Sequence, residues 1–253
     1  MSQFLVWIYV LAMGLMAVYG LLGLYTAWQY GRHRHESYPL PAYDPAALPT
    51  VTIQLPLYNE RYVVKRLIRA AVSLDYPAHL LQIQVVDDSS DDTAVRAAAL
   101  VHYYRHKGVN ISLVRRPERT GYKAGALGHA LAQASGELVG VFDADFVPAP
   151  DFLLQTVPHF INRPRLGIVQ ARWAHLNADA SPLTAAQAIA LDKHFAMEQV
   201  VRHRANLFPK FNGAAGVWRR AAIDDAGGWL DDTVCEDLCL STRAVLRQWE
   251  ALF

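Results

Sequence analysis

The segment LVGVFDADF, residues 138–146, decides the fold of this chain. Its first five residues are apolar and rich in valine, which predicts a buried strand. Asp143 and Asp145 follow, and side chains two apart in an extended segment point to the same side. Two carboxylates about 5 Å apart repel each other by roughly 3 kcal/mol at an effective dielectric of 20. We therefore expect a cation here, and Mg²⁺ or Mn²⁺ suits oxygen ligands and can bridge diphosphate oxygens.

Similar apolar runs recur along the chain between residues 50 and 253. Strands are predicted at 51–55, 81–86, 109–114, 138–142 and 166–171, and helices at 60–74, 91–107, 123–134, 183–204 and from about Asp237. Strands that alternate with helices predict an α/β domain with a mainly parallel sheet and helices on both faces. Ligands of such sheets bind beyond the carboxyl ends of the strands.

Acidic or polar clusters stand at three of these strand ends. They are Asn59-Glu60, Asp87-Asp88 and Asp143 with Asp145. Taken alone, each cluster is equally typical of a solvated turn or a helix cap. Their coincidence at one edge of a sheet favours a binding site, where Asp87 and Asp88 could accept hydrogen bonds from a nucleobase or ribose.

Three further segments carry candidate chemistry. Lys123 follows a glycine at the entry to a helix and could meet a diphosphate as a point charge. Glu236 and Asp237 lie at a helix start, where they stabilise the helix dipole or supply a general base. Arg172, in the segment QARW (170–173), could contact an acceptor or phosphate, or belong to an edge strand with a packed tryptophan.

The N-terminal segment predicts a membrane anchor at residues 1–31. Residues 4–28 contain no charged side chain, and about 20 apolar residues span a bilayer. A cleaved signal peptide fits less well, because no Lys or Arg precedes the run. The basic flank that begins at Arg32 then predicts that the rest of the chain lies in the cytoplasm, at a bacterial inner membrane or its equivalent. Residues 32–49, rich in Pro and Ala, predict a linker to a domain at 50–253.

Composition excludes some partners. The net charge of the 253 residues is +1, so nucleic acid is not an expected partner. Cys235 and Cys239 are four apart and belong to no longer set of ligands, so we expect two thiols in a reducing compartment.

Seven motifs stand in one order along the chain. They are QLPLYNE (54–60), VVDDSSDDT (85–93), GYKAGAL (121–127), FDADF (142–146), QARW (170–173), FNGAAGVWR (211–219) and CED (235–237). This set resembles the processive family 2 glycosyltransferases, close to cellulose synthase and the cellulose-synthase-like mannan and glucomannan synthases. The resemblance implies a GT-A fold and inverting transfer of a hexose from UDP-glucose or GDP-mannose to a β-glycan or lipid acceptor.

The resemblance also implies roles for individual residues. Asp87, Asp88 and Asp143 match nucleotide contacts, Lys123 matches a lysine near the diphosphate, and Asp145 matches the metal ligand. In the same comparison, Asp237 matches the catalytic base.

On the acceptor side, the resemblance places the loop of Phe211, Asn212 and Gly213 near the acceptor end, with Glu236 beside the base. The family has threonine where this chain has Cys235, and it has a Gln-x-x-Arg-Trp motif after the base. No such motif follows Asp237 here, so we expect a fragment that lacks part of the acceptor side.

Two other functions are alternatives to this one. A nucleotidyltransferase on a similar sheet would have a Gly-rich, basic loop after the first strand, where this chain has residues 56–60, PLYNE. Release of pyrophosphate would support that function. A non-catalytic membrane scaffold with a degenerate transferase domain is the other, and a stop codon directly after Phe253 would favour it.

Overall fold

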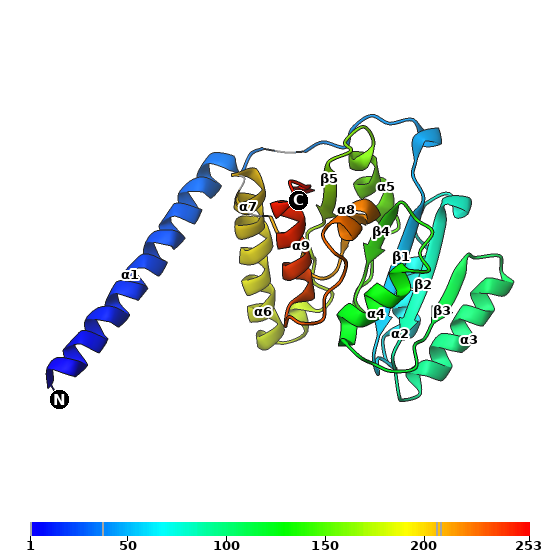
Figure 1. Cartoon of the computed structure of the whole chain (residues 1–253), viewed down its shortest axis with the longest axis horizontal. Coiled ribbons are helices and arrows are strands. Elements are labelled where there is room, and N and C mark those ends of the chain that lie inside the picture. Colours follow the sequence, from blue (N-terminus) through cyan, green and yellow to red (C-terminus); the bar gives the residue numbers. More distant parts are fainter. Residues whose placement is uncertain (1, 37, 206, 208) are drawn as a thin grey trace. The chain divides into compact units, whose positions relative to one another are not determined.

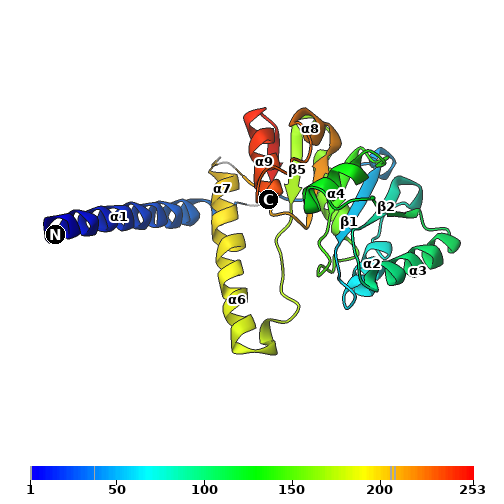
Figure 2. The same cartoon turned by 60° about the horizontal axis from the view of Figure 1, so that its bottom comes forward.

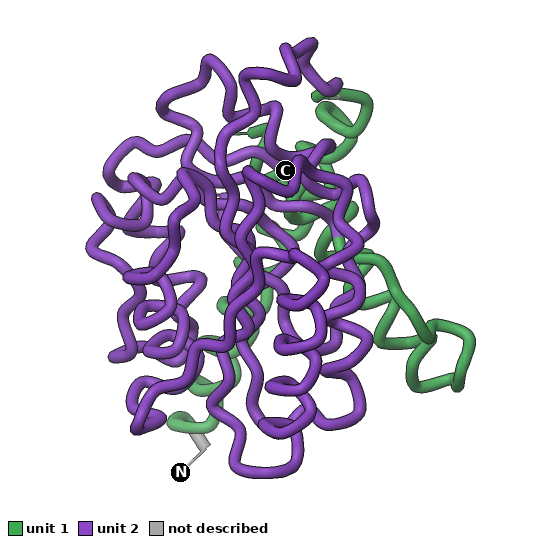
Figure 3. The backbone as a smooth tube through the Cα atoms, turned by 90° about the vertical axis from the view of Figure 1, so that its right-hand side faces the viewer, with its two compact units in different colours: residues 1–38, 173–207 green, residues 39–172, 208–253 purple. Residues whose placement is uncertain are grey.

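The computed structural model describes residues 2–36, 38–205, 207 and 209–253. Residue 1 of the predicted anchor and residue 37 of the predicted linker therefore lie outside the described residues. The chain divides into two compact units, one of residues 1–38 and 173–207 and the other of residues 39–172 and 208–253 (Figure 3).

The larger unit is built on one sheet with the strand order β3-β2-β1-β4-β6-β5-β7 (Figure 1). The strands are β1 (Val51–Leu57), β2 (Leu81–Asp87), β3 (Ile111–Val114), β4 (Leu138–Val141), β5 (Leu166–Gln170), β6 (Gly216–Arg219) and β7 (Glu250–Leu252). The pairs β1/β2, β1/β4, β2/β3 and β5/β7 are parallel, while β6 runs antiparallel to both β4 and β5. The predicted, mainly parallel sheet is thus confirmed, with one reversed strand that the sequence pattern did not indicate.

Helices cover both faces of this sheet, as predicted. They are α2 (Val64–Val72), α3 (Thr93–His106), α4 (Tyr122–Leu131), α5 (Phe152–Thr156), α8 (Arg220–Asp225) and α9 (Glu236–Leu246), with 3₁₀ turns at Pro45–Ala47, Ala78–Leu80 and Val157–Phe160. Figure 2 shows α4 on one side of β1 and β2, and α2 and α3 on the other. Right-handed crossovers explain this, because the chain steps outward from β1 to β3 and then returns to β4 in the opposite direction.

One part of the core lies between α4 and the sheet. Val139 and Val141 on β4 pack in one buried cluster with Leu127 of α4 and with Trp218 of β6. Side chains of alternate residues in a strand face the same side, so β4 meets α4 through its valines. This packing fixes α4, and with it the turn at the amino end of α4, against the end of β4.

Two predicted helices differ in detail. The first begins at Val64 and not at residue 60, because the N–H groups of Val63 and Val64 both donate to the carbonyl of Glu60 and form a turn there. The helix predicted at 183–204 is present as α6 (Pro182–Lys193) and α7 (Val200–Arg204), joined by a π-helical segment, His194–Gln199. Ser181 and Thr184 form the capping box that starts α6, after the 3₁₀ turn Ala178–Ala180.

The smaller unit combines α6, α7 and the N-terminal helix α1 (Ser2–His33). The guanidinium of Arg204 donates to the carbonyl of His33 at 2.6 Å, and the rings of Tyr38 and His203 lie 5.0 Å apart. The apolar side chains of α1 are exposed all around the helix. Residues Gln3–His33 have a mean hydropathy of 2.2, so this is one helix, among the described residues, that is long and apolar enough to cross a membrane.

Candidate functional site

The candidate site lies at the carboxyl edge of the parallel strands. The strand order reverses between β1 and β4, since β2 follows on one side of β1 and β4 lies on the other. Ligands of open α/β sheets bind at such a reversal, beyond the strand ends. Asp143 and Asp145 follow β4, and Asp87 is the last residue of β2, so the acids that the sequence singled out gather at this edge.

The amine of Lys123 is the centre of the site. It lies 2.5 Å from Oδ1 of Asp143, donates to the carbonyl oxygen of Gly213 at 3.1 Å and lies 3.8 Å from Oε1 of Glu236. One side chain thus brings together the start of α4, the end of β4, the loop before β6 and the start of α9. Gly121 precedes α4 with a φ of 69°, and a Cβ there would overlap the Asp231 carboxylate, so glycine is required for this turn.

Burial and like charges act on the acids around Lys123. Burial raises the pKa of Asp143, the neighbouring Lys123 opposes this shift, and the charges of Asp145 and Asp237 add to it. The pKa of Glu60 is raised first by burial and then by Asp145 and Asp143. The site therefore gathers more negative charge than Lys123 offsets. Glu60 was not among the predicted site residues, although it closes one of the polar clusters read from the sequence.

Asp237 faces the loop that carries Gly213. It is half-buried at the start of α9, where its Oδ1 accepts from the N–H of Leu238 at 2.7 Å. Gly213 has a φ of 79°, and a Cβ placed there would lie 3.1 Å from Oδ2 of Asp237 and 3.5 Å from Nζ of Lys123. A side chain at this position would therefore crowd the Asp237 carboxylate and would be strained by the positive φ.

Gln170 holds this loop in place, and its role was missed at the level of sequence. Its Oε1 accepts from the N–H of Asn212 at 2.9 Å, and its Nε2 lies 3.0 and 3.1 Å from the carbonyl oxygens of Ala214 and Ala215. The side chain is 4% exposed. A buried amide at the end of a strand must find such partners, and this was the signal available in the sequence.

Two residues predicted on the acceptor side, Phe211 and Arg172, lie in opposite surroundings, one buried and the other exposed. Phe211 is 1% exposed and packs against Trp218 with ring centroids 5.5 Å apart, so its ring anchors the loop from inside the core. The backbone of this loop, and not the Phe211 ring, is therefore the part that could lie near an acceptor, and its place on the acceptor side stays a prediction. Arg172 lies exposed just beyond β5.

Asp87 and Asp88 are in different surroundings. Asp88 forms a two-pronged ion pair with Arg116, with contacts of 2.9 and 2.6 Å, and both side chains are buried. Arg116 also donates to the carbonyl oxygens of Thr120 and Tyr122. Asp88 thus acts on the turn before Lys123. Asp87 is 1% exposed, and its Oδ1 accepts from the backbone N–H two residues further on at 3.0 Å.

The side chains near Asp145 decide what kind of metal site is possible here. In the described part of the chain, no three His, Cys, Asp or Glu side chains are grouped to hold a metal ion. Mg²⁺ commonly binds one or two carboxylates and completes its shell with substrate phosphates and water. Asp145 is exposed beside Asp143, so the residues fit an ion that is held jointly with a diphosphate and do not fit a site made of protein ligands only.

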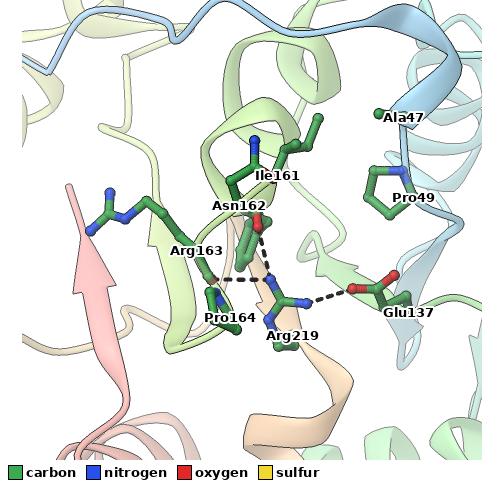
Figure 4. A pocket seen from close by; sticks show the side chains of 9 residues that line it. Ala47, Pro49, Glu137, Ile161, Asn162, Arg163, Pro164 and Arg219 are labelled. Atoms are coloured by element: carbon green, nitrogen blue, oxygen red, sulfur yellow. Dashed lines mark hydrogen bonds and ion pairs between the residues drawn. The ribbon is translucent and has the colours of Figure 1, made fainter.

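A separate pocket lies at the opposite edge of the sheet (Figure 4). Glu137, directly before β4, and Arg219, at the end of β6, form an ion pair there. Arg219 also donates to the carbonyl oxygens of Phe160 and Leu166. Since this guanidinium is already engaged by four oxygen partners including Arg163, the pocket is a structural junction at the amino ends of the strands, away from the carboxylates.

The comparisons with known proteins agree with this geometry. Residues 49–253 match the family described as "Glycosyltransferase like family 2". The chain is 45% identical over 209 residues to glucomannan 4-beta-mannosyltransferase 2 of Arabidopsis thaliana, a match that covers 81% of this chain and 39% of that protein. A rice protein, glucomannan 4-beta-mannosyltransferase 1, is 42% identical over 228 residues, with 87% and 44% covered. The chain therefore spans less than half the length of these relatives.

A solved structure has a similar fold and a related sequence. Mannosyltransferase PcManGT from Pyrobaculum calidifontis, solved in complex with GDP-Man and Mn²⁺, superposes with a TM-score of 0.74 at 28% identity, over 95% of this chain and 64% of that one. The S. aureus protein TarS superposes with a TM-score of 0.57 at 20% identity, which shows the fold alone.

The sheet topology, the family match and the structural neighbour define the class first: this is a GT-A glycosyltransferase domain. The chain belongs to glycosyltransferase family 2 and is homologous to the plant glucomannan mannosyltransferases.

Proposed function

We propose that this chain carries the donor site and the catalytic base of a membrane-anchored inverting mannosyltransferase that uses GDP-mannose. The observation that carries the proposal is the meeting of Lys123 with Asp143, Gly213 and Glu236 beside Asp237. The relatives are mannosyltransferases, which supports mannose as the sugar, and the GDP-Man complex of PcManGT supports GDP as the carrier. UDP-glucose is the other donor that the sequence suggested.

The proposed transfer is a single displacement at the anomeric carbon. The acceptor hydroxyl oxygen attacks this carbon, its proton passes to Asp237, and the bond between the carbon and the phosphate oxygen breaks. The configuration inverts, so an α-linked donor gives a β-linked product. Lys123 stabilises the charge that develops on the leaving diphosphate. A divalent ion on Asp145, Mg²⁺ or Mn²⁺, would supply further stabilisation of the same charge.

Asp143 and the buried acids complete the donor side of the proposal. Asp143 orients the amine of Lys123 through their 2.5 Å contact and meets the nucleotide next to it. Asp87, at the end of β2, and Asp88, through Arg116, are the proposed determinants of the nucleoside position. A glycan or lipid is the proposed acceptor, near Asn212, Gly213 and Arg172.

We further propose that α1 anchors the chain in a membrane. Its apolar side chains are exposed on every side, and no charged residue lies between residues 4 and 28. A helix that is apolar all round is stable where those side chains leave water. Arg32 and Arg34 follow it, and by the positive-inside rule they support a catalytic unit in the cytoplasm.

The test separates donor binding from transfer. Asp237→Asn keeps the shape of the side chain but cannot take a proton, so Mn²⁺-dependent GDP binding measured by titration calorimetry should stay close to wild type. GDP release from GDP-mannose, with a mannan oligosaccharide as acceptor, should fall by about 10² to 10⁴-fold. Asp179→Asn, an exposed position in the other unit, is the matched control. Near-wild-type turnover in Asp237→Asn would remove this residue from the role of base.

The metal and donor assignments need two further measurements. Asp145→Ala should lose the Mn²⁺-dependent part of nucleotide binding, and unchanged binding heats would contradict the metal role. A parallel assay with UDP-glucose decides the donor, because UDP release that exceeds GDP release would replace GDP-mannose in this proposal.

A further inference from the structure

An arginine with unused donors lies beside the site, on the turn that leads to Lys123. The guanidinium carbon of Arg119 lies 3.3 Å from the ring centroid of Tyr58 and 5.0 Å from that of Tyr122. Both tyrosines are exposed, at 42% and 68%. Within the residues that the structure describes, the guanidinium donates no hydrogen bond to the protein and forms no ion pair. Its N–H edge is therefore open to solvent and to a ligand.

The position of Arg119 relative to the proposed donor follows from its contact with Tyr58 and from its short distance along the chain to Lys123. Tyr58 directly follows β1 and precedes Asn59, whose Oδ1 accepts from the N–H of Ser90 at 2.9 Å. Arg119 thus lies at the carboxyl ends of β1 and β2, while Lys123, four residues further on, lies at the end of β4. A nucleoside diphosphate whose phosphates meet Lys123 would extend its nucleoside toward the β1 and β2 ends.

Arg116 holds the turn that carries Arg119. Arg116 is buried against Asp88 and donates to the carbonyl oxygens of Thr120 and Tyr122. The contact with Tyr58 adds a flat stacking surface, which arginine uses better than lysine does. The guanidinium is thus preorganised, so less conformational entropy is lost when its N–H groups bind a ligand.

The hydrogen-bonding pattern of the bases then decides which donor this arginine favours. Guanine presents two adjacent acceptors, N7 and O6, which match two N–H groups of one guanidinium. Adenine presents an acceptor beside a donor, and a pyrimidine such as uracil presents an isolated O4 on the corresponding edge. Only guanine can therefore accept both hydrogen bonds at once.

From this geometry we propose that Arg119, stacked on Tyr58, is a specificity-determining residue that selects a guanine nucleotide as the donor. The inference rests on the proposed function, since it presumes a nucleotide-sugar donor. It goes beyond that function by naming the residue that reads the base and the atoms that it reads.

The experiment measures the affinities of the full chain, purified in detergent with Mn²⁺, for GDP, UDP, ADP and 7-deaza-GDP. Wild type should bind GDP about tenfold more tightly than each of the other three nucleotides, 7-deaza-GDP included because it lacks the N7 acceptor. The comparison of GDP with 7-deaza-GDP needs no variant, so misfolding cannot affect it.

Arg119→Lys should lower the affinity for GDP by about tenfold while the affinity for UDP changes by less than about threefold. In this variant GDP and 7-deaza-GDP should bind alike. Arg96→Lys makes the same change on the exposed face of α3, where the arginine pairs with Asp92, and should leave all four affinities at their wild-type values.

Each remaining outcome is decisive. Equal losses for GDP and UDP in Arg119→Lys would overturn the base-reading role, because they would report only a lost positive charge or a disturbed turn. Wild-type protein that binds UDP as tightly as GDP would overturn guanine selection and leave the transferase proposal intact. Wild-type protein that binds no nucleotide at all would overturn the proposed function and this inference with it.

Discussion

Replacing Gln170 by glutamate or by methionine tests how the loop before β6 is held. Glutamate keeps the oxygen that accepts from the N–H of Asn212, but turns a second oxygen toward the carbonyls of Ala214 and Ala215. Methionine has a similar length and offers neither a good donor nor a charge. Both variants should lose stability, and they should differ in how the loss depends on pH.

The magnitude follows from the bonds at this side chain. An amide nitrogen has two hydrogens, so Gln170 donates two bonds at a time and accepts one, and about 1 kcal/mol for each gives about 3 kcal/mol lost in Gln170→Met. For a chain of this size, that loss corresponds to a fall in Tm of about 6–12 °C. Glutamate keeps one bond but adds a buried carboxylate without a cationic partner, which costs further stability while it is ionised.

The sign of the pH dependence distinguishes the two variants. A carboxyl group whose charged form is disfavoured by burial has a raised pKa in the folded state. Its protonated form still accepts from the N–H of Asn212 and can donate to one carbonyl, so Gln170→Glu should be more stable than Gln170→Met below the pKa of the unfolded chain. The stability should then be lost as the pH rises through the folded-state pKa.

Circular dichroism measures this pH dependence of stability. The detergent-solubilised wild type and both variants are unfolded by heat at pH 5 and at pH 8. The Tm of Gln170→Glu should fall between the two pH values by more than that of wild type or of Gln170→Met. A Gln170→Glu protein within about 1 °C of wild type at pH 8 would refute the hydrogen bonds assigned to this side chain.

Other perturbations address the rest of the site. Arg116→Met leaves the buried carboxylate of Asp88 unpaired and should cost about 3–5 kcal/mol in urea unfolding, part of which Arg116→Met/Asp88→Asn should restore; an additive double variant would contradict the pairing. Gly213→Ala should lower the rate of sugar transfer, since its Cβ would lie 3.1 Å from Oδ2 of the proposed base. Gly108→Ala is the control: Gly108 has a similar φ of 83° but lies in open space, so this change should cost only about 1 kcal/mol of stability and leave transfer unaffected. Equal transfer rates in the two variants would refute the crowding at Gly213. Because the pKa of Glu60 is raised in the folded state, its ionised form destabilises the protein, so Glu60→Gln should raise Tm at pH 7 and raise it less at pH 4; a lowered Tm at pH 7 would contradict this.

The sequence alone predicts the parts of this structure that local patterns encode. The apolar run before Asp143 became β4, and the acids after β2 and β4 lie at one edge of the sheet, as the alternation of strands and helices indicated. The antiparallel insertion of β6 between β4 and β5 was not predictable, because its short strand has the same apolar pattern as the parallel strands. The π-helical segment His194–Gln199 was not predictable either, because the residues on both sides of it keep the periodicity of an ordinary α-helix.

The hydrogen-bond and ion-pair partners of the buried polar side chains could not be predicted from the sequence either. Asp88 and Arg116 are 28 residues apart, and Gln170 bonds residues more than 40 positions further along the chain. Nothing in the local sequence tells which of several arginines will pair with a given acid, since the choice depends on the assembled fold. The sequence pattern therefore suggested direct nucleotide contact for Asp88, and the structure adds its ion pair with Arg116.

The contact of 2.5 Å between Lys123 and Asp143 has a consequence for the order of binding. A divalent ion held by Asp145, beside Asp143, would meet an ammonium group that is already in place, and the two cations would repel each other. A diphosphate removes the conflict, because its oxygens offer the amine a new counter-ion and offer the metal further ligands. Metal and donor should therefore bind synergistically, each raising the affinity for the other.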